Sequence, residues 1–162
     1  MAVDMFIKID GIDGESKDHK HKGEIEAFSF SWGLTNTGSH SSGGGGGAGK
    51  VSVQDLTFVA PTSNSSPHLM EACCTGQHIP NVTLTFATRE TKQEYLKIKL
   101  TDVLISSYQT GAAGGSVPTD QVSFNFRSVD IQAANRQGQF EQVSCDFGGA
   151  KLEDGGGLKH NH

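Results

Sequence analysis

The sequence predicts a mainly β fold, a small closed β-barrel of two sheets with one short flanking α-helix. Most of the chain alternates apolar and polar residues with a period of two, and clusters of Gly, Pro, Asn or Ser divide the alternating segments. The alternation slips by one residue twice, between Val53 and Leu56 and between Phe126 and Val129. A slip that keeps apolar side chains on one face is typical of a β-bulge, and bulges bend a sheet towards closure.

Seven segments carry the strand pattern and one carries a helix pattern. The strand segments are residues 5–9, 24–34, 51–59, 82–88, 94–108, 121–131 and 140–147. Residues 65–76 predict the helix, because Ser66 can cap its start, Pro67 suits the first helical position and Gly76 can end it. A helix this short needs packing partners, so we expect it to cover an open end or side of the barrel.

The pattern predicts a single domain. Residues 1–147 make up the barrel, with residues 38–50 as an extended glycine-rich loop. Residues 148–162 have no periodic apolar pattern and are expected to be a mobile tail. A chain of 162 residues can bury a sufficient core without metal or disulfide, so we expect Cys73, Cys74 and Cys145 to be reduced thiols.

Charge and hydropathy exclude several classes of partner. The formal net charge is −5 and no basic stripe is present, which argues against nucleic acid. No apolar run approaches the roughly 20 residues that a membrane-spanning helix needs, so membrane insertion is not expected. The first residues, "MAVDMFIKID", lack the basic region and apolar core of a signal peptide. We expect a protein made in the cytoplasm that leaves the cell, if at all, by another route.

One segment mimics a nucleotide-binding loop. "GGGGAGK", which ends at Lys50, satisfies the G-x-x-x-x-G-K pattern. Val51 stands where a hydroxyl should bind magnesium, and a strand-like segment follows where a helix should begin. We therefore interpret the run as an extended connection and predict no nucleotide cofactor.

Candidate metal ligands and catalytic groups are incomplete. The candidate metal pairs are His19 with His21 and His160 with His162. No Cys or carboxylate cluster completes either pair, so solvated histidines are favoured. Glu24 and Glu26 share a strand face, where carboxylates are usually solvated, and no nucleophile elbow is present. We predict no catalytic, cofactor or metal site and no enzymatic activity.

The segment 24–34 carries the most informative alternation. Phe28, Phe30 and Trp32 share one face, which is predicted to be core. Ser29 and Ser31 share the other face, which is small, polar and neutral. Such a face suits either sheet-on-sheet packing or the lining of a cavity, and alternation alone leaves both open.

Four segments together carry a family resemblance. They are "MAVDMFIKIDGIDGESKDHKHKGEIEAFSFSWG", "GGGGGAGKVSVQDLTFV", "SPHLMEACCTGQHIPNVTLTF" and "EYLKIKLTDVLISSY". In this order, from Met1 to about Ile131, the chain resembles the haemolysin-coregulated protein (Hcp) family of bacterial type VI secretion systems. The resemblance implies a small barrel with a flanking helix and a homohexameric ring. Stacked rings would form the expelled inner tube, capped by a spike protein within a contractile sheath, and the lumen would carry small effectors.

The resemblance also assigns roles to residues. It implies that Ser29 and Ser31 contact effectors in the lumen, and that the loop after "SWG" reaches ring neighbours. The candidates for that subunit interface are Gly43, Gly44, Gly45, Gly46, Gly47 and Lys50. The protein would leave the cytoplasm through the type VI machine without a signal peptide. The alternatives are a monomeric β-barrel ligand-binding module and, with no residues to support it, a secreted enzyme.

Overall fold

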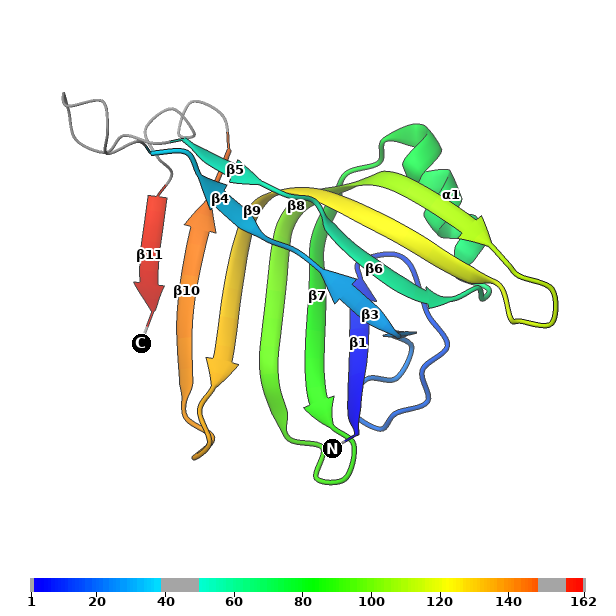
Figure 1. The fold of residues 1–162 in the computed structure, drawn as a ribbon, viewed down its shortest axis with the longest axis horizontal. Helices are drawn as coiled ribbons and strands as arrows, with labels where there is room; N and C mark the ends of the chain where they lie inside the picture. Colours follow the sequence, from blue (N-terminus) through cyan, green and yellow to red (C-terminus); the bar gives the residue numbers. More distant parts are fainter. Residues whose placement is uncertain (1, 39–49, 149–156, 162) are drawn as a thin grey trace.

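The computed structural model describes residues 2–38, 50–148 and 157–161 (Figure 1). Eleven strands and one helix lie in this part of the chain. They are β1 (Val3–Ile9), β2 (Ile25–Ala27), β3 (Ser29–Ser31), β4 (Leu34–Asn36), β5 (Val51–Val53), β6 (Leu56–Pro61), α1 (Ser66–Thr75), β7 (Ile79–Thr88), β8 (Glu94–Gly111), β9 (Thr119–Ala134), β10 (Phe140–Asp146) and β11 (Gly157–Asn161).

The strands form a barrel by a closed circuit of antiparallel pairings. In order, β1 pairs with β7, β7 with β8, β8 with β9, β9 with β6, and β6 with β3. β2 pairs with β1 and leads directly into β3, so the segment 25–31 closes the circuit. β4 and β5 form a separate two-stranded sheet. The predicted mainly β barrel with one flanking helix is confirmed.

The long strand β9 changes partner along its length. Its first half, Thr119–Phe124, pairs with β6, and its second half, from Ser128 to Ala134, pairs with β10. β11 then pairs with β10 at the sheet edge (Figure 1). The sequence predicted a mobile tail without regular structure over residues 148–162. Gly157–Asn161 instead form the strand β11, because backbone pairing to β10 does not require an apolar pattern.

The core fills the interior of the barrel. Phe58 and Phe124, on the paired strands β6 and β9, are fully buried, with ring centroids 5.5 Å apart. Phe30 packs on Phe86 at 5.1 Å, and Trp32 lies 6.1 Å from Phe126. The apolar face of each strand therefore meets those of the strands across the barrel, as closure requires.

Phe28 does not lie in the core, and this prediction is wrong. Its side chain is 66% exposed. Ile25 and Ala27 face inward on β2, whereas Phe30 faces inward on β3, so the alternation slips by one residue at Phe28. The slip occurs where the segment leaves β1 and joins β6, and the bend turns Phe28 outward.

The two one-residue slips in the apolar–polar alternation were predicted to be β-bulges, but the structure gives them other causes. Between Val53 and Leu56 the chain leaves the β4–β5 sheet and enters the barrel as β6. Between Phe126 and Val129, β9 continues without a register shift and changes partner. Register shifts occur instead at Phe86/Ala87 and at Ile105/Ser107.

A loop, residues 10–24, covers the outer face of β1. His21 in this loop is buried and stacks on Phe6, with ring centroids 4.5 Å apart and planes 9° apart. Its Nδ1 lies 3.0 Å from Glu24 Oε2, and its Nε2 lies 3.0 Å from Glu94 Oε1. Lys92 also donates to Asp18 at 2.8 Å, and this hydrogen bond lowers the pKa of Asp18. The loop is thus held to the start of β8.

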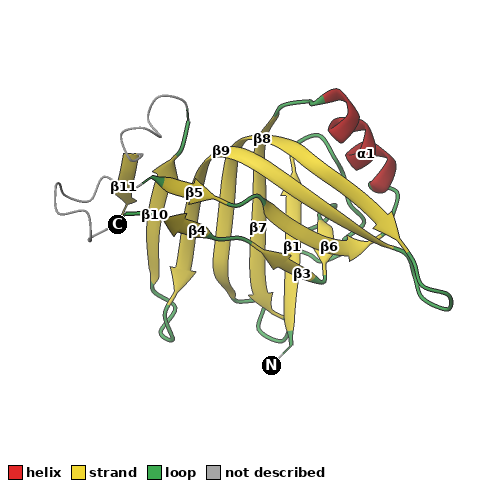
Figure 2. Ribbon diagram, turned by 45° about the horizontal axis from the view of Figure 1, so that its top comes forward, coloured by secondary structure: helices red, strands yellow, loops and turns green. Residues whose placement is uncertain are grey.

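The helix α1 packs beside β8 at one end of the barrel (Figure 2). Leu69 and Ala72 are its buried apolar residues, and Gly76 ends it at φ +67°, donating to the Ala72 carbonyl at 3.1 Å. Ser65, not Ser66, is the residue before the first turn. The Ser66 hydroxyl instead donates to Asp120 of β9, which ties the helix to the barrel.

Asp120 is the centre of a buried polar network. It is 2% exposed and accepts hydrogen bonds from the hydroxyls of Ser66, Thr62 at 2.9 Å and Tyr108 at 3.1 Å. The donors come from the segment after β6, from α1 and from β8. Burial and the charge of Asp120 raise the pKa of Tyr108.

Tyr108 predicts a loss of stability at alkaline pH. Because its pKa in the folded protein is raised above the ordinary 10.0, the folded chain holds the proton more tightly than the unfolded chain. The stabilisation that comes from this tighter proton binding is complete below pH 10 and is lost as pH rises through the raised pKa of Tyr108. We expect the free energy of unfolding in urea to fall more steeply above pH 10 for the wild type than for Tyr108→Phe. Equal slopes for the two proteins would contradict this.

Candidate functional site: a neutral polar face on the barrel wall

The candidate site is the outer face of four neighbouring strands, β3, β6, β9 and β8. Strand register aligns their hydroxyl side chains in one row. That row runs Ser31, Thr57, Ser123 and Ser107, each opposite the next. The Thr57 and Ser123 hydroxyls are hydrogen-bonded at 2.7 Å, and Ser31 and Ser107 are exposed. The row therefore presents hydroxyl groups across the width of the wall.

A second row lies two residues along the same face. It runs Ser29, Val59, Gln121 and Gln109. The row between the two, from Phe30 through Phe58 and Val122 to Tyr108, faces the core. We call the two outer rows the polar face, which contains Ser29, Ser31, Thr57, Val59, Ser107, Gln109, Gln121 and Ser123.

The polar face carries no formal charge. None of its eight residues is Asp, Glu, Lys or Arg. At one corner Asp55 accepts from Ser106 at 2.5 Å and from Asn125 at 3.1 Å, so this carboxylate is hydrogen-bonded at the margin of the face. Hydroxyls and amides can donate and accept hydrogen bonds with many partners, and without a charge they hold none of them tightly.

Ser29 and Ser31 are the only two of these residues that the sequence singled out. The other six lie on β6, β8 and β9, and each looks ordinary on its own strand. What makes the face is the register that places them side by side, which one strand's alternation does not report. The neutral polar residues at alternate positions of "DQVSFNF" were the available signal.

The interface loop predicted from the sequence falls largely outside the described residues. Gly43, Gly44, Gly45, Gly46 and Gly47 all lie there. Lys50 is described, is exposed, and its carbonyl accepts from the Thr37 N–H at 3.3 Å.

The structure describes both side chains of only one predicted histidine pair, His19 with His21. His19 is exposed, whereas the ring nitrogens of His21 contact the carboxylates of Glu24 and Glu94. His162 lies outside the described residues, and only the backbone of His160 is described. Within the described part of the chain no group of three or more His, Cys, Asp or Glu could hold a metal ion.

Cys73, Cys74 and Cys145 are free, and burial raises the pKa of Cys145. No described helix is both long enough and apolar enough to cross a membrane.

Comparison with known proteins identifies the family. Residues 6–133 match the family described as "Type VI secretion system effector, Hcp". Protein hcp1 of Pseudomonas aeruginosa is 48% identical, over 99% of this chain and 94% of that protein. The crystal structure of Hcp1 from Salmonella typhimurium is 35% identical, with a TM-score of 0.79 over 91% of this chain and 96% of that one.

A further solved structure, described as that of a type six secretion system protein, is 30% identical. Its TM-score is 0.84, over 98% of this chain and 100% of that one. The residues matched to the family include all of β3, β6 and β8 and nearly all of β9, which carry the polar face. The chain belongs to the Hcp family of type VI secretion proteins.

Proposed function

We propose that this chain assembles into six-membered rings that stack into the inner tube of a type VI secretion system. The ring lumen carries and stabilises small effectors, and the tube works with the spike protein and sheath of the same system. The protein is made in the cytoplasm and leaves through this machine. Membership of a structural, secreted family that is not an enzyme family supports this proposal.

The neutral polar face is the observation that carries the lumen assignment. In a ring whose axis faces β3, six copies of the face place rings of hydroxyls and amides around a central channel. A carrier must hold its cargo and then release it, so a wet surface with many weak hydrogen bonds suits it better than a charged or apolar one.

The mass of the purified protein tests the assembly. We expect light scattering after size-exclusion chromatography to give six times the chain mass of 17.2 kDa. A monomer that binds a sugar or peptide would contradict the proposal and support a ligand-binding module instead.

Ser31→Glu tests the lumen. We expect this change to abolish stabilisation of a co-expressed cognate effector while the ring mass stays unchanged. Ser31 is exposed, so glutamate leaves the fold intact but adds six charges and narrows the channel. The control is Ser116→Glu in the exposed β8–β9 turn, outside the polar face. Effector half-life is the measurement, and an unchanged half-life in an intact Ser31→Glu ring would remove this face from the lumen.

A further inference from the structure

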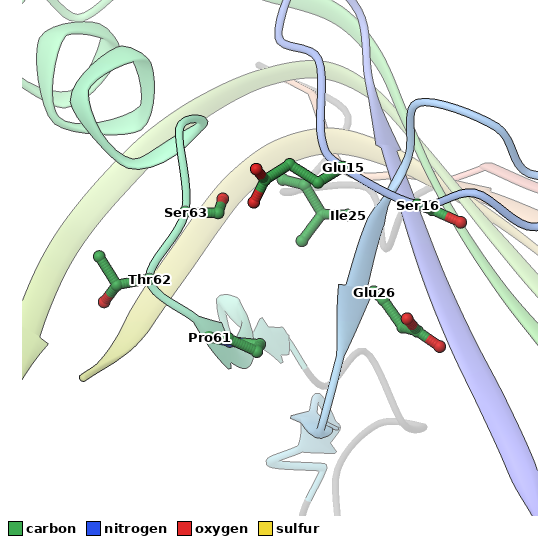
Figure 3. Close-up of a pocket in the computed structure, with 7 residues that line it drawn as sticks. All are labelled: Glu15, Ser16, Ile25, Glu26, Pro61, Thr62 and Ser63. Atoms are coloured by element: carbon green, nitrogen blue, oxygen red, sulfur yellow. The ribbon is translucent and has the colours of Figure 1, made fainter. Parts of the chain in front are cut away.

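An exposed aromatic side chain stands beside two hollows on the β2 side of the barrel. Phe28 lines one hollow of about 260 Å³, together with Val3 and Ala27. The second hollow, of about 200 Å³, lies between β2 and the segment after β6 (Figure 3). Glu26 and Pro61 line both hollows. We call Phe28, Glu26, Pro61 and Glu15 of the second hollow the β2 flank.

The backbone fixes the position of Phe28. Its N–H donates to the Val59 carbonyl at 2.7 Å, and the residues on either side belong to β2 and β3. A phenyl ring that is 66% exposed in the bend between two strands leaves apolar surface in water, which costs free energy in the single chain. Exposed aromatic residues beside hollows are typical of the centre of protein interfaces.

The β2 flank is acidic. Glu15 and Glu26 are both exposed, and neither forms an ion pair within the described part of the chain. In Figure 3 the Glu15 side chain is directed towards Ser63, and Glu26 projects outward from β2. Arg89 lines the hollow at Phe28 but already pairs with Asp4 at 2.9 Å. A basic group from outside the chain would therefore complement this surface.

The β9–β10 turn offers the matching chemistry. Phe140, at the start of β10, is 48% exposed, and Arg136 is exposed in the turn. Arg89 and Arg127 pair with carboxylates, whereas Arg136 forms no ion pair among the described residues. The Asn135 side chain donates to Gln139 Oε1 at 2.9 Å and accepts from the Gln139 N–H at 3.0 Å across the turn. The described part of β11 pairs with Gln142–Asp146, so this pairing does not extend to Phe140.

We propose that the β2 flank of one copy receives the β9–β10 turn of the next copy in the ring. This inference rests on the proposed ring and names the surface that forms it. Along the sheet, β10 and β2 are separated by β9, β8, β7 and β1, whereas the other way round the barrel passes through β9 and β6 to β3. Figure 1 shows β10 at the left of the view and β3 to the right of the centre. Two different, complementary surfaces make a head-to-tail contact, which closes into a ring by rotation.

Phe28→Ser tests the apolar part of the contact. We expect the apparent dissociation constant of the ring to rise by roughly tenfold or more, because an aromatic side chain at an interface centre is removed. The control is Met70→Ser, since Met70 is 51% exposed on α1 and lines neither hollow. Light scattering across a dilution series gives the ring mass, and circular dichroism checks that each variant is folded. A Phe28→Ser variant that holds its ring mass as the wild type does, or that unfolds, overturns the inference.

An exchange of charges tests which surfaces meet. Glu26→Arg alone and Arg136→Glu alone should each weaken the ring, because each places like charges in contact. The double variant should recover most of the wild-type dissociation constant. Single variants without effect, or a double variant weaker than both singles, overturn the assignment of the β9–β10 turn.

The two proposals fail in different ways. If the wild type is monomeric at all concentrations, the ring itself is wrong and the contact falls with it. If the wild type is hexameric and the Phe28 and charge variants are also hexameric, the ring stands and only this contact is wrong.

Discussion

Asp120→Ala is expected to lower the free energy of unfolding by about 3 to 4 kcal/mol. The change removes the carboxylate that accepts from the hydroxyls of Thr62, Ser66 and Tyr108, at a site that is 2% exposed. Leaving a buried donor without a partner costs about 1 to 3 kcal/mol, and a shared cavity lets the losses overlap. The helix α1 would also lose its side-chain tie to β9, so it should be the first element to loosen.

Urea unfolding at one fixed protein concentration measures this effect, because assembly would otherwise change the apparent stability. Asp120→Asn is the matched variant, since it keeps one acceptor oxygen and should lose clearly less stability than alanine. Asp13→Ala, at an exposed residue, should stay within about 0.5 kcal/mol of the wild type. A loss below about 1 kcal/mol for Asp120→Ala would show that the hydroxyls find other partners.

His21→Ala should cost about 2 to 3 kcal/mol and release the loop 10–24 from the barrel. The ring lost here stacks on Phe6 and bridges two carboxylates, on Glu24 and Glu94. Without it, Phe6 is exposed to water, and the carboxylates of Glu24 and Glu94 lose the ring that bridges them. Aromatic stacking and charge-assisted hydrogen bonds both contribute to the loss.

Limited proteolysis with trypsin gives a local measurement of the same change. The loop contains Lys17, Lys20 and Lys22, so its release should speed cleavage there before the barrel unfolds. His19→Ala is the control, because His19 is exposed in the same loop. Cleavage of His21→Ala and His19→Ala at the same rate would mean that His21 does not hold the loop.

The sequence predicted the barrel because its signals are local. Alternation, turn residues and a short helix with Pro67 and Gly76 at its ends each depend on neighbouring residues only. Phe28 was misplaced because a strand was assumed to keep one partner, whereas β2 pairs with β1 and β3 with β6. A change of partner within a run of alternating residues leaves no mark on composition.

Only part of the candidate site could be predicted from the sequence, for a related reason. Ser29 and Ser31 stand out because their strand has no charged residue beside them, but Thr57 and Ser123 become relevant only through register. His21 resembled a solvated histidine, since its partner Glu94 lies far along the chain. β11 has no apolar alternation and exists through backbone pairing to β10.

The segment that closes the barrel is also its most weakly held part. It is attached by three register pairs to β1 and three to β6, with Phe28 between them. Short pairings at the junction of two edges open more readily than long central strands, so amide hydrogens of Ile25–Ser31 should exchange with solvent before those of β8 and β9. A neighbouring copy bound at the β2 flank would hold the segment 25–31 in place. Barrel closure and ring formation would then be thermodynamically linked. The segment 25–31 would open more often in an isolated chain than in one assembled into a tube.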